Sequence, residues 1–146
     1  MQVDVHPDLE SALGSDKATF VTRFCDWKKG DEFGSYFFGK NGGYRTPTLD
    51  FPQSQLMHVH LVPLHDVKQL GIWNRLSDRR SRKTSNRVLI YAERSSTQYL
   101  LIDILEEADD PHTIANMTTQ EDKDMMYAYA AIANCYIESG DILIID

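Results

Sequence analysis

The sequence predicts an α+β fold, in which helices pack on an antiparallel sheet of three to four strands. An amphipathic helix pattern comes first, three strand-like segments follow, and a C-terminal helix pattern packs on the sheet. Strands that follow one another, with helices at either end, are typical of α+β domains. The 146 residues, 42% of them hydrophobic, suffice for a single domain over residues 1–146 with a substantial core.

The N-terminal part is expected to be helical. Phe20, Phe24 and Trp27 recur at i, i+4 and i+7, so they form one apolar stripe on a helix over residues 16–29. Two lysines occupy its last turn, where positive charge complements the helix dipole. A short additional turn of helix is expected over residues 9–13.

The middle of the chain predicts a loop and then the sheet. Glycines and prolines crowd residues 39–54, which is typical of a loop. Strands are predicted over residues 56–62, 87–92 and 98–105. The short connector between the last two predicts a hairpin, and apolar residues on both faces of the third strand predict a central position.

The C-terminal helix has a clear start and end. Thr118-x-x-Glu121 is a capping-box signature, and Ser139-Gly140 marks the end. Apolar residues recur every three to four positions between them, as on the buried face of a helix. The tail over residues 141–146, DILIID, is either an added edge strand or a docking segment.

Positive charge is concentrated in one segment of an acidic chain. The net charge is −7, yet residues 68–94 hold eight of the fifteen basic residues against two acidic ones, a local charge of +6. Such a patch indicates a localised anionic ligand, for example a phosphate backbone. The alternative is a solvated loop that offsets the acidic ends of the chain.

The sequence argues against a membrane-bound or secreted protein. It has no apolar run of 18 residues, and its start lacks the basic and apolar regions of a secretory signal. Cys25 and Cys135 lie far apart and show no metal-ligand spacing. We therefore expect reduced, buried thiols in a cytoplasmic protein.

Two histidines two residues apart, His58 and His60, share one face of their predicted strand because side chains alternate along a strand. Three roles are open for them. They could be metal ligands, acid–base catalysts, or ordinary residues of a half-exposed sheet face. A metal would need a third ligand such as His65, Asp66 or His112.

Basic side chains lead into the second strand. Arg82, Lys83 and Arg87 can bind phosphate, and Tyr91 can stack on a base. Arg87 and Tyr91 are four apart on a strand, so they share a face, which also carries the histidines if the first two strands pair. This arrangement suits metal-free RNA cleavage, and it requires His60 and Tyr91 on the same side of the sheet. A solvent-facing sheet side with ordinary charges is the alternative.

Several segments occur in a characteristic order between about residues 18 and 137. In this order and approximate spacing, the chain resembles the YafO family of toxins from bacterial type II toxin–antitoxin systems. The segments are Phe24-x-x-Trp27-Lys28-x-Gly30, Phe38-Gly39-Lys40, Leu56-x-His58-Val59-His60-Leu61, Ser81-Arg82 with Leu89-Ile90-Tyr91, Tyr99-Leu100-Leu101-Ile102-x-Ile104-Leu105, and Pro111-His112-x-x-Ala115.

The resemblance implies a RelE-like fold and a toxin that inhibits translation and growth. Such a toxin would be an endoribonuclease that cleaves mRNA on the ribosome without a metal or cofactor, and a cognate antitoxin protein would silence it. By position, Arg82 would hold the scissile phosphate, His60 would move a proton, Tyr91 would orient a base or the phosphate, and His112 would assist. Supporting RNA contacts are expected from His58, Lys83, Arg87, Arg79 and Arg80.

One departure from the family leaves a second interpretation open. Toxins of this kind tend to end in a basic segment, whereas this chain ends in acidic and apolar residues. The alternative function is a non-catalytic interaction protein of the same fold that binds a protein or ribosomal partner.

Overall fold

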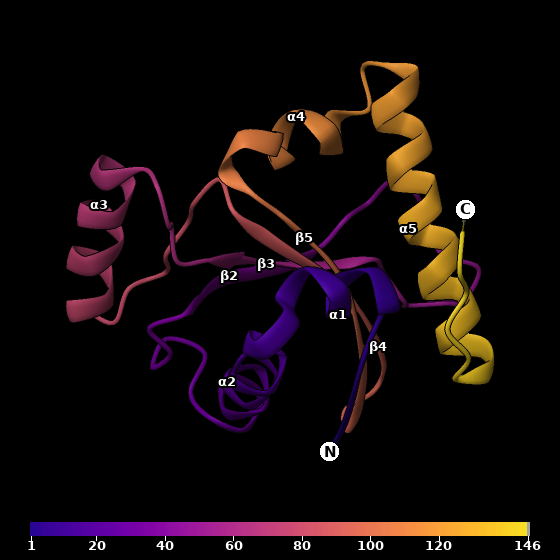
Figure 1. Ribbon diagram of the computed structural model, residues 1–146, viewed down its shortest axis with the longest axis horizontal. Helices are drawn as coiled ribbons and strands as arrows, with labels where there is room; N and C mark the ends of the chain where they lie inside the picture. The colour runs from indigo at the N-terminus through magenta and orange to yellow at the C-terminus, as the bar shows by residue number, and fades with distance from the viewer. Residues whose placement is uncertain (146) are drawn as a thin grey trace.

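A five-stranded sheet forms the centre of the molecule in the computed structural model, which describes residues 1–145 (Figure 1). The spatial order of the strands is β1-β5-β4-β3-β2. Their bounds are Gln2–Val5 for β1, Phe38–Gly43 for β2, Met57–Leu61 for β3, Val88–Ser95 for β4 and Gln98–Leu105 for β5.

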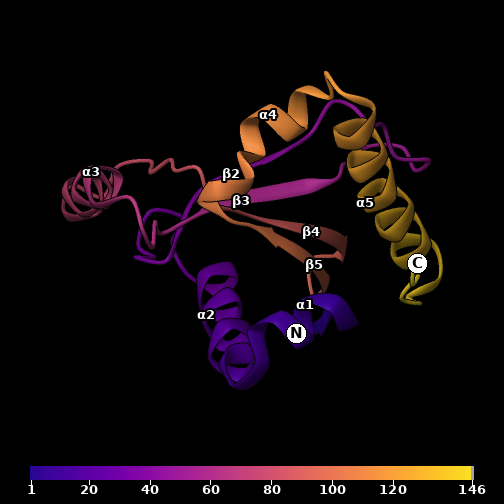
Figure 2. The same cartoon turned by 45° about the horizontal axis from the view of Figure 1, so that its top comes forward.

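Helices cover both faces of this sheet. Two N-terminal helices lie below one face, while two C-terminal helices lie over the other, and one helix stands beyond the end of the sheet (Figures 1 and 2). The N-terminal pair is α1 (Pro7–Leu13) and α2 (Lys17–Lys29), and the C-terminal pair is α4 (Pro111–Asn116) and α5 (Gln120–Ser139). The helix beyond the end of the sheet is α3 (Val67–Asp78). Short 3₁₀ turns at Gly14–Asp16 and Glu107–Asp109 join neighbouring elements.

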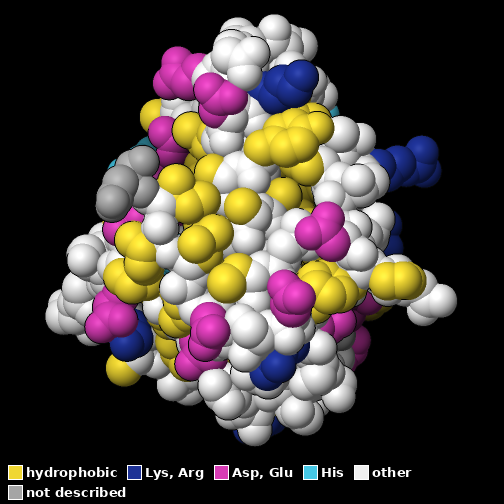
Figure 3. Space-filling model, turned by 90° about the vertical axis from the view of Figure 1, so that its right-hand side faces the viewer, with side chains coloured by type: hydrophobic (Ala, Val, Ile, Leu, Met, Phe, Trp, Pro, Cys, Tyr) yellow, Lys and Arg dark blue, Asp and Glu magenta, His cyan; other side chains and the backbone are white. Residues whose placement is uncertain are grey.

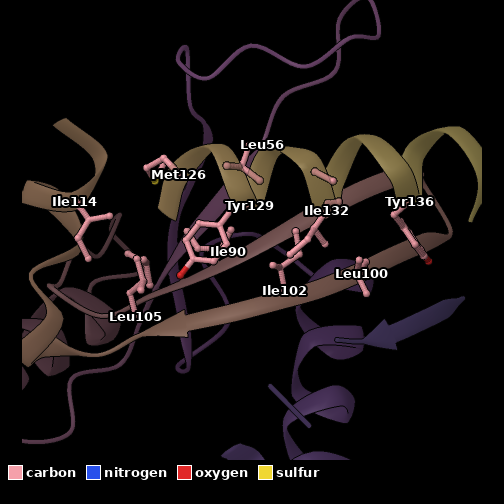
Figure 4. Close-up of a cluster of buried hydrophobic side chains, with 13 residues drawn as sticks. Leu56, Ile90, Leu100, Ile102, Leu105, Ile114, Met126, Tyr129, Ile132 and Tyr136 are labelled. Atoms are coloured by element: carbon pink, nitrogen blue, oxygen red, sulfur yellow. The ribbon is translucent and has the colours of Figure 1, made fainter. Parts of the chain in front are cut away.

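The alternation of side chains along β4 creates two hydrophobic cores. Val88 and Ile90 face α5, whereas Leu89 and Tyr91 face α2. Figure 4 shows the α5 side, where one face of the helix lies directly over apolar side chains of β4 and β5. Both sides of the central strands are therefore buried from solvent, which explains their continuous apolar sequence.

The hairpin, the central strand and the last helix are confirmed. β4 pairs antiparallel with β5, and β5 lies between β4 and β1. The helix begins one residue later than predicted, because the side chain of Thr119, and not that of Thr118, accepts a hydrogen bond from the backbone N–H of Asp122 at 3.1 Å. Gly140 ends it in the left-handed conformation with φ of 79°.

The prediction of a purely antiparallel sheet of three to four strands is wrong in two places. β1 adds a strand parallel to β5, so the sheet is mixed and has five strands. β2 occupies part of the glycine-rich segment that was expected to be a loop. Gly39 is required there for close packing and not for a turn, because a Cβ atom at this position would lie 2.3 Å from the carbonyl oxygen of Lys83.

The C-terminal tail docks on the chain itself. Residues 141–145 form no strand, Ile142 and Leu143 pack against the α5-side core, and the carbonyl oxygen of Leu143 lies 3.0 Å from Nε2 of His6. Asp146, the last residue of the predicted segment, lies outside the described residues. The face formed by α5 and the tail shows many hydrophobic side chains with acidic ones between them (Figure 3).

Both cysteines, Cys25 and Cys135, are free thiols. Within residues 1–145, no helix combines the length and the apolar character needed to cross a bilayer.

Candidate functional site

A pocket of about 390 Å³ lies on the α5 side of the sheet, with walls from α3 and α4. These two helices flank the ends of the strands in Figure 2. Strand β3 supplies the histidines of its floor, and the loop before β4 supplies one rim. The polar and aromatic side chains that line it are Tyr44, His58, His60, Gln69, Thr84, Ser85, Asn86 and His112.

His60 is fixed by the backbone of a single residue, Ser85. Its Nδ1 atom lies 2.7 Å from the carbonyl oxygen of Ser85 and 3.0 Å from the backbone nitrogen of the same residue. In the tautomer whose Nδ1 donates to the carbonyl oxygen, Nε2 keeps a lone pair that can accept a proton. Burial lowers the pKa of His60, and the charge of Lys40 and the ring of His112 lower it further, against the opposing hydrogen bond to Ser85. The ring is therefore neutral at neutral pH and suited to act as a base.

His58 lies beside His60, with ring centroids 5.9 Å apart, and it stacks on Tyr44. The Tyr44 and His58 rings lie 4.2 Å apart at an interplanar angle of 15°. Burial is the main cause that lowers the pKa of His58 to about 4. The neighbouring ring of His60 and the charge of Lys40 also lower it, whereas the backbone of Gly42 acts in the opposite direction. The Nδ1 atom of His58 is buried and has no hydrogen-bond partner among residues 1–145. This ring is thus a neutral, flat surface with one unsatisfied polar atom.

Lys40 does not line the pocket, but its positive charge acts on both pocket histidines, and the sequence did not predict a site residue at this position. The register of β2 against β3 shifts between Phe38 and Asn41, which places an irregularity opposite His60. Asn41 faces the α2 side, while Lys40, its neighbour along the strand, brings positive charge toward His58 and His60. The sequence signal at this position is a lysine directly after a glycine, in a segment whose glycines and prolines predict a loop.

His112 belongs to the same pocket. It lies exposed in the first turn of α4, which begins at Pro111. Its proximity contributes to the lowered pKa of His60. The structure therefore brings together three of the predicted residues, His58, His60 and His112, from two separate elements.

Tyr91 does not join them, and the expectation that it shares a face with His60 is wrong. In the register of β3 against β4, Tyr91 pairs with Met57 and Ile90 pairs with His58, so Tyr91 points to the α2 side. It is fully buried there. Burial raises the pKa of its phenol far above the ordinary range, and the hydroxyl donates to Oδ1 of Asn41 at 2.5 Å.

Lys83 and Arg87, which were expected to contact RNA, do not face the pocket either. The side chain of Lys83 is only 1% exposed, and its Nζ donates to the carbonyl oxygen of Ser35 at 2.6 Å. Arg87 is 12% exposed, donates to Glu106 at 2.7 Å and lies on the α2 side with Phe38. Neither cation faces the histidine pocket in this structure, because a fixed internal partner holds each one.

The other predicted cations, Arg79, Arg80 and Arg82, are exposed in the segment that joins α3 to β4. Arg80 forms an ion pair with Asp31. Arg82 lies two residues before Thr84, whose side chain lines the pocket. Of the three, Arg82 is therefore the closest along the chain to the pocket rim.

Within the part of the chain that the structure describes, no group of three or more histidine, cysteine, aspartate or glutamate side chains is placed to hold a metal ion.

A family model described as toxin YafO of type II toxin–antitoxin systems matches residues 25–138 of this chain. This range includes strands β2 to β5, helices α3 and α4, and every residue that lines the pocket. A search of curated proteins and a search of solved structures both find no match.

Proposed function

Because the chain belongs to the YafO family of toxins from type II toxin–antitoxin systems, we propose that it is an endoribonuclease that cleaves mRNA in the histidine pocket. The observation that supports this proposal is the convergence of His60 and His112 on one pocket, with Nδ1 of His60 held by the backbone carbonyl of Ser85. The family also implies a cognate antitoxin protein as its partner. In the cytoplasm, cleavage of mRNA would inhibit translation and growth.

The proposed reaction is metal-independent transesterification. Nε2 of His60 takes the proton of a ribose 2′-hydroxyl, and the 2′-oxygen attacks the adjacent phosphorus. His112 gives a proton to the departing 5′-oxygen of the next nucleotide. The products are a 2′,3′-cyclic phosphate and a 5′-hydroxyl end. A neutral imidazole suits the base because only the unprotonated ring can accept the proton of the 2′-hydroxyl.

Lys40 and Arg82 are proposed to neutralise the phosphate. The charge of Lys40 already acts on both pocket histidines, and Arg82 is exposed two residues before Thr84, which lines the pocket. Cations stabilise the negative charge that builds up on a pentacovalent phosphate. Lys40 thereby replaces Lys83 and Arg87 as a phosphate contact, and Tyr91 has no part in the chemistry.

The ribosome is proposed to position the substrate. A chain with a net charge of −7 repels RNA at long range, and unaided binding depends on neutralised phosphates. Ribosome-bound mRNA would be presented to the pocket without that long-range attraction.

The test uses purified protein in a translation extract, with mapping of the 5′ ends of the mRNA. Wild-type protein should generate 5′-hydroxyl ends, while His60→Ala and His112→Ala should each reduce cleavage by about 10²-fold or more. Arg82→Ala should reduce it less, and His65→Ala, which alters an exposed histidine outside the pocket, should cleave normally.

Two results would contradict the proposal. Ends with a 5′-phosphate would indicate metal-dependent hydrolysis instead. Full toxicity of His60→Ala without any mRNA cleavage would favour a non-catalytic interaction protein of the same fold.

A further inference from the structure

The side chain of Gln69 enters the pocket wall with a fixed orientation. Its backbone N–H donates to the carboxylate of Asp66 at 3.0 Å, which fixes the residue in the first turn of α3. Its side-chain Oε1 accepts from the backbone N–H of Asn86 at 3.2 Å. Since the acceptor end of the carboxamide is held, the NH₂ end with its two donors is the part presented to a ligand.

Asn86 completes a polar edge beside Gln69. Its backbone anchors Gln69, while its own exposed carboxamide lines the same pocket and offers both donors and an acceptor. Two adjacent carboxamides of this kind match the pattern of donors and acceptors along the edge of a nucleobase.

Apolar and aromatic surface lies across the same pocket. The stacked rings of Tyr44 and His58 line it, together with Ile72 from α3 and Pro111 from α4. Stacking of a base on an aromatic side chain contributes binding energy whichever base is present. The volume of about 390 Å³ lies in the range of small-ligand sites.

The charge of the lining selects the kind of ligand. Among residues 1–145, the side chains that line the pocket include no aspartate, glutamate, lysine or arginine. The lowered pKa values of His58 and His60 keep both rings neutral at neutral pH. The part of the pocket beside Gln69 and Asn86 therefore suits a flat, uncharged group with hydrogen-bonding edges.

We propose that this pocket binds one nucleobase of the RNA, and that Gln69, oriented by the backbone of Asn86, determines which base is accepted. The inference takes RNA as the substrate from the proposed function. It adds a sequence preference at the cleavage site and assigns it to two residues that line the same pocket as His60 and His112.

The first experiment measures binding without catalysis. The four 3′-nucleoside monophosphates are titrated separately into the wild-type protein, and NMR follows the side-chain NH₂ signals of Gln69 and Asn86. One base should bind at least about tenfold more tightly than the others, which corresponds to about 1.4 kcal/mol. Absence of shifts in these signals with all four nucleotides would overturn the inference.

Variants separate base selection from general binding. Gln69→Leu should abolish the preference among the four nucleotides, and Tyr44→Ala should weaken all four alike, whereas Tyr44→Phe keeps the stacking ring and should bind normally. Gln120→Leu is the matched control, because Gln120 lies exposed at the start of α5 and bonds to Asp124. An unchanged preference in Gln69→Leu would refute the role of this residue.

The same variants distinguish failure of this inference from failure of the nuclease proposal. Cleavage in the translation extract with identical cut sites for wild type and Gln69→Leu would overturn base selection and leave the nuclease intact. Base-selective nucleotide binding by a wild-type protein that cleaves no mRNA would overturn the nuclease and support the base pocket.

Discussion

The hydroxyl of Tyr91 donates a 2.5 Å hydrogen bond to Asn41 on the face of the sheet opposite His60. The Nζ of Lys28 donates to the same hydroxyl at 3.3 Å. This contact ties β4 to β2 across β3 and holds Asn41 at the irregularity that brings Lys40 toward the histidines. Tyr91 therefore supports the candidate site from behind the sheet and does not contact a ligand in the pocket.

We predict that Tyr91→Phe lowers the free energy of unfolding by about 1–3 kcal/mol, because Asn41 and Lys28 lose their common partner in a buried setting. Urea unfolding monitored by circular dichroism measures this change. Under conditions where the variant is fully folded, mRNA cleavage should stay within a few-fold of wild type. A 100-fold loss of cleavage at unchanged stability would indicate that Tyr91 takes part in the reaction.

The buried His58 predicts a specific pH dependence of stability. Its folded-state pKa of about 4 lies below the unfolded value of 6.5, so the unfolded state binds the proton more readily. Its contribution to stability is complete above about pH 6.5 and is lost as the pH falls toward 4. The expected loss is up to roughly 3 kcal/mol, from 1.36 kcal/mol per pKa unit.

His58→Phe should flatten that part of the curve, since phenylalanine keeps the stack on Tyr44 and cannot be protonated. Guanidinium unfolding at pH 7 and pH 4.5 compares the variant with wild type, and His65→Gln serves as the exposed control. If wild type and His58→Phe lose the same free energy between these pH values, the buried neutral ring is not responsible.

Two glycines should respond oppositely to replacement by alanine. A Cβ atom at Gly39 would lie 2.3 Å from the carbonyl oxygen of Lys83 and 2.8 Å from Trp73, so Gly39→Ala should destabilise by about 1–3 kcal/mol. A Cβ atom at Gly71, inside α3, meets nothing within 4 Å, so Gly71→Ala should stabilise by about 0.5–1 kcal/mol. Thermal unfolding of both variants tests the pair, and equal effects would contradict the close packing of β2 on Lys83.

The start of α5 offers a similar comparison of neighbouring residues. Thr119→Ala should cost about 1 kcal/mol, because its side chain accepts the N–H of Asp122, whereas Thr118→Ala should change stability by less than about 0.5 kcal/mol. Differential scanning calorimetry gives both values. A larger loss of stability for Thr118→Ala than for Thr119→Ala would show that the helix begins one residue earlier, as the capping-box pattern predicts.

The candidate site was predictable only in part. Strand alternation along β3 correctly placed His58 and His60 together, and His112 was identified through the family resemblance. Lys40, Gln69 and Asn86 were missed, because each comes from a different segment and becomes a neighbour only when α3 and β2 pack beside β3.

The cationic segment shows the same limit. Its high charge density was evident in the sequence, but the individual partners were not. Lys83 donates a hydrogen bond to the carbonyl oxygen of Ser35, and Arg87 forms an ion pair with Glu106. These contacts hold both cations away from the pocket proposed to bind RNA. Sequence composition cannot separate them from the exposed Arg82, since all three are basic residues within six positions.

The sequence by itself determined the features that depend on near neighbours: the α5 helix, the β4–β5 hairpin, and the shared face of His58 and His60. Hydrogen bonds between residues close in the chain and the alternation of a single strand fix these features. The tertiary structure alone decided the parallel addition of β1, the face occupied by Tyr91 and the closure of the pocket. These depend on the register between strands, and a shift of one residue moves a side chain to the other side of the sheet.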